Sequence, residues 1–302
     1  MAALDTIADR QAQWSVTANA LKREIDRARW AVFGFSVMGA LLATLASQMG
    51  GGKDAAPVAL VADPRTWLAI FGAACLATAT FFTQRLLGQD HVTGWVRARA
   101  ISEALKREAY KFAAGAAPYD QADAEARLDA ERQKIEADGD DLLESLAGSP
   151  GKGSVPRTRL APQDYVAKRV DGQIAFYTKR ADGYRTTAIG LRRAEFGLAL
   201  AATLITAVAS VTGKTTPVFG VGFDLAALTA VVTTIAGAVL AHVEASRFDF
   251  LVTTYRATAR RLQDRKSGPL APASAFVNDC ETIIATENLS WLAKWTKPEK
   301  PS

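Results

Sequence analysis

The turn Val211-Thr212-Gly213-Lys214-Thr215 contains residue types that could bind a phosphate group. Its Gly-Lys-Thr ending matches the end of a phosphate-binding loop, in which backbone amides surround the phosphate and a lysine neutralises it. A complete loop also has a glycine five residues before Gly213, but Val208 occupies that position. The turn follows an apolar segment of helical length rather than a strand. We therefore interpret it as a polar turn and predict no nucleotide site.

The histidines and cysteines could bind a metal or take part in catalysis, but they are widely separated. The two histidines are His91 and His242, and the two cysteines are Cys75 and Cys280. Neither histidine has a carboxylate or a cysteine at a ligand spacing, and the sequence contains no HExxH or CxxC motif. We expect both histidines to lie at a membrane interface. We predict no catalytic residues, no metal and no cofactor, and therefore no enzyme activity.

Four segments of the chain are apolar and contain no Asp, Glu, Lys or Arg. They cover about residues 30–49, 66–84, 196–213 and 225–243. About 20 residues rising 1.5 Å each span the roughly 30 Å hydrocarbon core of a bilayer. The alternative is a large soluble protein with buried core helices, but four separate segments reach or approach the spanning length of about 18 residues. We predict an all-α membrane protein with four transmembrane helices in two hairpins.

Small and hydroxyl residues follow helical spacing inside these spans. Such a face lets helices approach closely and form hydrogen bonds, or it lines a wet pore in an oligomer. We favour helix packing, which is compatible with a pore if another face opens. The absence of charged residues argues against ion-coupled transport, which usually places them at membrane depth. The candidate pore or helix-packing residues are Ser36, Thr44, Ser47, Thr203, Thr206, Ser210, Thr229 and Thr233.

Lys and Arg gather beside the spans and are scarce in the loop inside each hairpin. Because basic residues near span ends favour the cytoplasmic side, we predict a multi-pass protein of the cell inner membrane with both termini cytoplasmic. The net charge of +5 indicates a face that meets anionic lipid headgroups, and no aromatic-basic motif indicates a nucleic-acid partner. The flanking basic residues are Lys22, Arg23, Arg27, Arg29, Arg85, Arg97, Arg99, Arg185, Arg192, Arg193, Arg247 and Arg256.

The segment before the first span carries an apolar seam with alternating steps of three and four residues. A seam of this length needs a partner, either the segment after the second span or the same helix of another subunit. Further along, residues 120–146 are highly charged, and we interpret them as a solvated helix. The seam consists of Leu4, Ile7, Gln11, Trp14, Ala18, Leu21, Ile25 and Ala28.

The order of segments indicates an internal repeat of amphipathic helix, membrane hairpin and amphipathic helix. Residues 148–162 contain several Pro and Gly and no periodic pattern, so we predict a linker there. The first two-span unit is then 1–147 and the second is 163–302. Since each unit crosses the membrane twice, both have the same orientation. This is a parallel repeat, unlike the inverted repeats of many secondary transporters.

The helices beside the spans resemble those of SLATT proteins, two-transmembrane domains associated with nucleotide second-messenger defence systems in bacteria. The first unit resembles one subfamily through RARAISEALKREAYKFAAGAAPYD (97–120), and the second resembles a sister subfamily through DYVAKRVDGQIAFYTKRA (164–181). Phe176 departs from the Trp that is typical of the family but keeps an aromatic ring. The family-like positions are Arg97, Glu103, Pro118, Tyr119, Tyr165, Arg169, Asp171, Gln173, Tyr177, Glu287 and Trp291.

The resemblance implies a tandem SLATT protein that acts as a pore-forming effector in antiviral defence, linked to SMODS and SLOG nucleotide signalling. Its expected partners are the lipid bilayer, further copies of the same chain and a nucleotide-sensing or nucleotide-producing protein. It would permeabilise or depolarise the host membrane when that partner signals. The alternative is a membrane-anchored scaffold whose cytoplasmic helices recruit a partner without forming a pore. A small-molecule transporter is less favoured because the spans lack charge.

Overall fold

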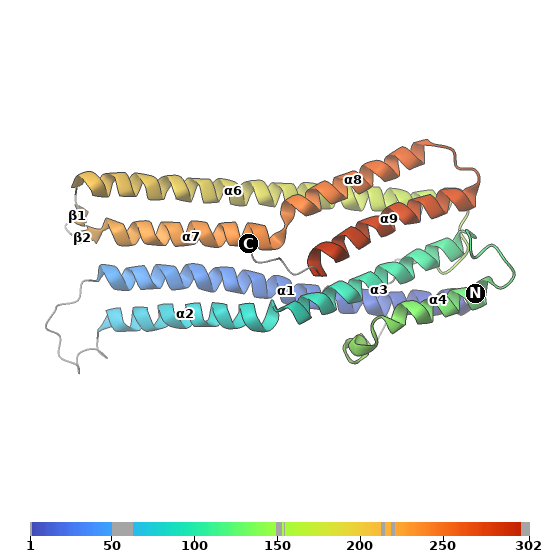
Figure 1. The fold of residues 1–302 in the computed structure, drawn as a ribbon, viewed down its shortest axis with the longest axis horizontal. Helices are drawn as coiled ribbons and strands as arrows, with labels where there is room; N and C mark the ends of the chain where they lie inside the picture. Colours follow the sequence, from blue (N-terminus) through green and yellow to red (C-terminus); the bar gives the residue numbers. More distant parts are fainter. Residues whose placement is uncertain are drawn as a thin grey trace. The chain divides into compact units, whose positions relative to one another are not determined.

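A computed structural model describes residues 2–49, 63–148, 153, 155–212, 215–218 and 221–296 (Figure 1). Several sequence-based predictions concern residues outside these ranges. They are most of the loop in the first predicted hairpin, residues 149–152 and 154 of the predicted linker, and Gly213 and Lys214 of the turn that ends like a phosphate-binding loop.

The described chain is almost entirely helical, so the predicted all-α class is confirmed. The two short strands pair as an antiparallel hairpin between α6 and α7, a feature that the sequence analysis did not predict. The elements are α1 (Ala2–Gln48), α2 (Pro64–Leu86), α3 (Gln89–Ala113), α4 (Ala124–Ala137), the 3-10 helix η2 (Asp140–Ser145), α5 (Pro162–Tyr165), the π-helix η3 (Val166–Asp171), α6 (Gly172–Thr212), β1 (Thr215–Val218), β2 (Val221–Asp224), α7 (Leu225–Ser246), α8 (Phe248–Ser267) and α9 (Ala273–Thr296).

Capping side chains and residues with positive φ mark several of the helix ends. Asp63 accepts a hydrogen bond from the backbone amide of Arg65 at the start of α2, and Asp224 caps α7 in the same way. Gly115 follows α3 with a φ of +63°, a left-handed conformation that glycine adopts without strain. Arg247 has a φ of 50° and separates α7 from α8.

The helices form two compact units, and α1 and α6 each contribute to both. The polar unit comprises Met1–Ile25, Gly88–Gly183 and Phe250–Ser302, and the apolar unit comprises Asp26–Leu87 and Tyr184–Asp249. Each unit thus combines residues from both halves of the sequence. The predicted division into 1–147, 148–162 and 163–302 concerns order along the chain, and it stays a prediction.

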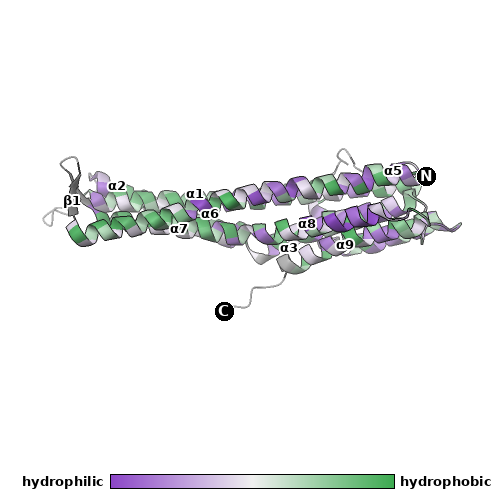
Figure 2. Ribbon diagram, turned by 90° about the horizontal axis from the view of Figure 1, so that it is seen from above, coloured by the Kyte–Doolittle hydropathy of each residue, from purple (hydrophilic) through white to green (hydrophobic). Residues whose placement is uncertain are grey.

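The apolar unit contains the predicted spans. Helices that include all four predicted segments are long and apolar enough to cross a membrane, and Figure 2 colours α7 predominantly hydrophobic. At most 17% of the residues in any of the four apolar windows are buried inside the protein. Large side chains such as Phe196 (69% exposed) and Leu204 (58% exposed) face outward. Buried core helices of a soluble protein would show the opposite pattern, so we reject that alternative.

Close contacts hold the apolar unit together. A Cβ atom at Gly39 of α1 would lie 2.8 Å from the Leu76 side chain and 3.1 Å from the Gly72 carbonyl oxygen of α2. Small residues thus let these two helices approach closely, as membrane helices often do. The Gln48 side chain at the end of α1 exchanges two hydrogen bonds of 2.8 Å with the Asp224 backbone at the start of α7.

In the polar unit, the N-terminal seam of α1 packs within the same chain. Leu4, Ile7 and Trp14 are fully buried, and Gln11 donates a hydrogen bond of 3.1 Å to Ser102 of α3. Of the two partners that the seam left open, the structure therefore shows the segment after the second span. This bond pairs the buried Gln11 Nε2 across the contact, while Gln11 Oε1 has no hydrogen-bond partner among the described residues.

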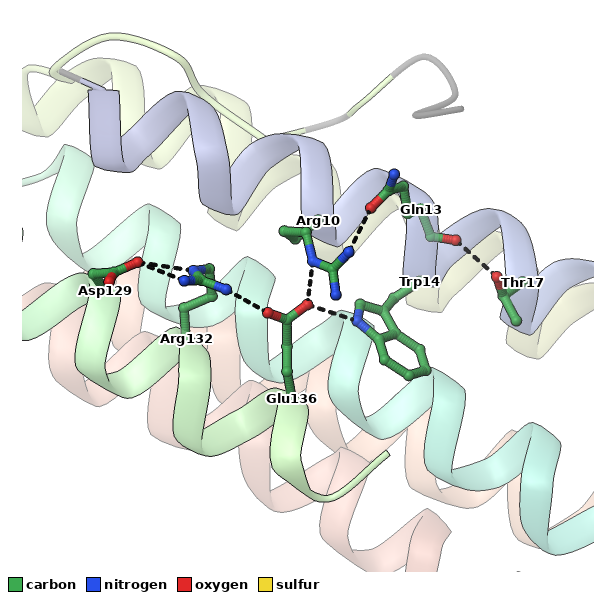
Figure 3. Close-up of polar contacts among 7 residues, drawn as sticks. All are labelled: Arg10, Gln13, Trp14, Thr17, Asp129, Arg132 and Glu136. Atoms are coloured by element: carbon green, nitrogen blue, oxygen red, sulfur yellow. Dashed lines mark hydrogen bonds and ion pairs between the residues drawn. The ribbon is translucent and has the colours of Figure 1, made fainter. Parts of the chain in front are cut away.

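Helix α4 completes the partner surface for α1. Figure 3 shows the Glu136 carboxylate between Arg10 and Trp14 of α1 and Arg132 of its own helix. Glu136 accepts hydrogen bonds from Trp14 Nε1 at 3.0 Å and from Arg132 Nη1 at 2.6 Å. Leu128 is fully buried. The prediction that this segment is a solvated helix was therefore wrong for one of its faces.

Candidate functional site: a buried polar core

The centre of the polar unit is a buried ion pair between Arg169 of η3 and Glu281 of α9. The guanidinium donates two parallel hydrogen bonds to the carboxylate, from Nε at 2.9 Å and from Nη2 at 2.8 Å. Tyr165 donates a third from its hydroxyl at 3.0 Å. Each side chain of the ion pair is only 1% exposed. Such a pair is stable only if hydrogen bonds compensate for the lost hydration, and these three bonds do so for the carboxylate.

The electrostatic surroundings keep Arg169 charged. Burial lowers the pKa of this guanidinium, but the carboxylates of Glu281 and Glu103 raise it by more, so the net shift is upward. The guanidinium also lies 4.7 Å from the centre of the Tyr110 ring of α3. Its Nη1 atom has no hydrogen-bond partner among the described residues. The ion pair therefore forms a fixed charged centre to which α3 contributes a carboxylate and an aromatic face.

A second buried carboxylate, Glu287, lies two turns further along α9. It accepts a hydrogen bond of 3.3 Å from the Tyr177 hydroxyl of α6 and is 2% exposed. Burial, together with repulsion from Glu103, raises its pKa to about 7, although Arg99 and Tyr177 act in the opposite direction. Arg99 of α3 lies 4.6 Å from the centre of the Trp291 ring. Helices from both halves of the sequence thus share one polar core.

A smaller cluster surrounds Glu108 at the other end of α3. Tyr119 donates a hydrogen bond of 2.8 Å to Glu108 Oε2, and Arg107 donates one of 2.6 Å to Oε1. Burial and the neighbouring Glu108 carboxylate raise the pKa of Tyr119, which keeps its hydroxyl protonated as a donor. Pro118 follows a cis peptide bond, and the Ala117 amide donates a hydrogen bond of 2.9 Å to the Ser274 hydroxyl in the first turn of α9.

The family-like positions do not all lie in one cluster. Six of them belong to the central core or contact its residues: Glu103, Tyr165, Arg169, Tyr177, Glu287 and Trp291. Tyr119 and Pro118 belong to the smaller cluster. Arg97 instead pairs with Asp141 at the surface, Asp171 pairs with Lys266, and Gln173 is half-buried.

Sequence reasoning missed Glu281, Arg99 and Glu108 as site residues. Glu281 directly follows the buried Cys280 in α9, and this adjacency to a residue type that is usually buried was the available signal. The arrangement provides charge pairing between helices. In the described part of the chain, no group of three or more His, Cys, Asp or Glu residues could hold a metal ion.

A groove of about 630 Å³ lies between α3, α4 and α9. Its apolar lining includes Ile101, Ile135 and Ile284, while Arg107 and Glu131 are among its charged residues. The volume is in the range of small-molecule sites. Glu103 also lines this groove, so the polar core reaches an accessible surface there.

The hydroxyl residues predicted in the spans satisfy their own helices. Thr203, Thr206, Ser210, Thr229 and Thr233 each donate to a backbone carbonyl three or four residues earlier, as does Ser47 to Thr44. Because of these hydrogen bonds, no unpaired hydroxyl of these residues is exposed to an apolar medium. The Thr206 and Thr229 hydroxyl oxygens also lie 3.5 Å apart between α6 and α7. Ser36 is half-buried. Whether these faces pack or line a pore stays a prediction.

The fold and the site define a helical membrane protein with a separate polar helical unit. Residues 165–291 match the family described as SMODS and SLOG-associating 2TM effector domain 1, so the chain contains a SLATT domain. Residues 12–127 match a second family, described as protein of unknown function (DUF4231). Comparison with curated proteins and with solved structures found no match. The SLATT resemblance is confirmed for the second half, and for the first half it stays a prediction.

Proposed function

We propose that this protein is an oligomeric membrane effector that permeabilises or depolarises the membrane of its host cell when a partner protein signals. One observation carries the proposal: residues of both sequence halves share the buried polar core of the polar unit, and α1 and α6 continue from that unit as membrane-spanning helices. A change of packing in the core would thus act on two spans at once.

The signal would come from a nucleotide-sensing or nucleotide-producing partner, as the description of the matched effector domain suggests. We place the protein in the cell inner membrane with both termini in the cytoplasm, following the distribution of basic residues. In this orientation the polar unit faces the partner. Residues 1–147 and 163–302 would act as two equivalent two-span units, and no enzymatic step is involved.

A membrane-anchored scaffold is the second candidate, and the groove between α3, α4 and α9 is the observation that favours it. A scaffold needs its spans only as anchors. The two functions therefore differ in whether they depend on the particular sequences of the four spans.

Replacing the four spans with unrelated transmembrane sequences of equal length separates the two candidates. The test expresses the wild-type chain or the replaced chain in bacteria together with the partner and records membrane potential with a voltage-sensitive dye. An effector loses depolarisation after replacement even though insertion is unchanged. A scaffold recruits its partner equally well before and after replacement and depolarises in neither case.

A further inference from the structure

The carboxylate of Glu287 is buried with incomplete hydrogen bonding. Its Oε1 atom has no hydrogen-bond partner among the described residues, and the bond that Oε2 accepts from Tyr177 is long at 3.3 Å. Six residues earlier on α9, Glu281 is equally buried but accepts three bonds of 3.0 Å or less. An ionised carboxylate in the place of Glu287 therefore loses hydration without full compensation, whereas a protonated one loses little.

The charged and titratable groups around Glu287 come from every helix that packs against it. Arg99 and Glu103 belong to α3, and Tyr177 belongs to α6. The positive charge of Arg99 is shared, because Glu103 and Tyr255 of α8 attract it as well. Glu103 itself repels an ionised Glu287. Lys106 and Arg169 stabilise the charge of Glu103 more than Arg99 does, whereas Arg99 is the cation that offsets the charge of Glu287. Glu287 therefore relies on a guanidinium that also interacts with Tyr255 and Glu103.

We propose that Glu287 is a proton-dependent switch of helix packing, which holds α9 against α3 and α6 when protonated and loosens it when ionised. The switch lies on the surface where the two halves of the sequence meet. Tyr177 lies in the part of α6 that belongs to the polar unit, and the same helix continues as a span. Ionisation of Glu287 would thus weaken the packing of α9 against α3 of the first sequence half and against α6 of the second.

The direction of the pH effect follows from the shift in proton affinity. The pKa of Glu287 is raised from 4.5 to about 7, first by burial and then by Glu103. If α9 opens and Glu287 meets water, its pKa returns toward 4.5, so the packed state binds the proton more tightly than the open state. Packing therefore weakens as the pH rises from 4.5 to about 7 and stays weak above it. Between pH 6 and pH 8 the population of the open state should rise about tenfold.

Hydrogen exchange measured by mass spectrometry on the full chain in lipid nanodiscs tests this switch. The amides of α9 should lose protection about tenfold between pH 6 and pH 8, after correction for the intrinsic exchange rate. Glu287→Gln, which cannot ionise, should abolish this dependence. Asp279→Asn is the matched control, since Asp279 is an exposed carboxylate on the same helix, paired with Arg265. The control variant should keep the dependence of the wild type.

A second variant keeps the Glu287 carboxylate and changes its pKa. Tyr177→Phe removes the hydrogen bond that lowers the pKa of Glu287, so the midpoint of the protection change should shift to higher pH. This result remains available if Glu287→Gln does not fold. A protection change that persists in Glu287→Gln, or a midpoint that does not move in Tyr177→Phe, would overturn the proposal. Because exchange and not leakage is measured, the outcome is independent of the proposed membrane activity.

Discussion

Arg169 and Glu281 form a two-bond ion pair inside the polar unit, although 112 positions separate them in the sequence. Arg169 precedes the third predicted span and Glu281 follows the fourth. The pair therefore ties the segment that enters the second set of spans to the segment that leaves it. Tyr165 completes the site by bonding to the same carboxylate. The pair is thus a long-range constraint on how the polar unit packs.

Removing one partner of this pair should be more damaging than removing both. Glu281→Leu leaves a buried guanidinium without a counterion, and we expect a loss of about 3–5 kcal/mol in the free energy of unfolding. Arg169→Met combined with Glu281→Leu should recover most of this loss, because no buried charge remains unpaired. Thermal unfolding in detergent micelles, followed by circular dichroism, measures the difference. Equal destabilisation by the single and double variants would contradict the buried ion pair.

The contact between α1 and α2 depends on glycines that leave no room for a side chain. Gly39→Leu should destabilise the apolar unit by about 1–3 kcal/mol, since its Cβ would lie 3.1 Å from the Gly72 carbonyl oxygen as well as 2.8 Å from Leu76. Gly34→Leu is the matched control on the same helix, because no atom lies within 4 Å of a Cβ at that position. Thermal unfolding in micelles should show a lower midpoint for Gly39→Leu alone. A similar shift for both variants would argue against the close approach of α1 and α2.

The thiol of Cys280 should be unreactive in the folded protein. Burial raises its pKa to about 12, so the thiol remains protonated at pH 6, and the side chain is fully shielded from solvent. A maleimide reagent at pH 6, where α9 is packed, should modify Cys280 only after denaturation, as measured by mass spectrometry of the peptide that contains it. Rapid modification of the folded chain at pH 6 would show that α9 is not packed as described.

The sequence was sufficient to predict the spans and the N-terminal seam, because both are signalled by local periodicity and by the absence of charge. The sequence was not sufficient to pair Glu281 with Arg169, because a separation along the chain does not show which residues of two distant helices lie opposite each other. The charged segment containing Leu128 was predicted to be solvated because its overall composition is charged, although one face of the helix is buried. The partner of Glu136 was equally hidden, since Arg10 and Trp14 lie more than 120 positions away.

The predicted orientation in the membrane makes a separate test possible. A cysteine introduced by Ala55→Cys falls in the loop predicted from the sequence between the first two spans, and one introduced by Ala130→Cys lies on an exposed face of α4. In intact bacterial cells, an impermeant maleimide should label the first position and not the second. Labelling of both positions should occur only after the inner membrane is disrupted. The opposite pattern would place the polar unit outside the cytoplasm.

The most direct test of the central claim is leakage from liposomes that contain the purified full chain. The vesicles are loaded with a small fluorescent dye or with a potassium gradient, and release is followed with and without candidate cyclic nucleotides and the neighbouring sensor protein. The membrane-effector account predicts release that requires both the chain and its trigger, with the size of the released dye setting a lower bound on the opening. Vesicles that retain dye and potassium, although the chain is correctly inserted and the trigger is bound, would contradict this account and favour the scaffold.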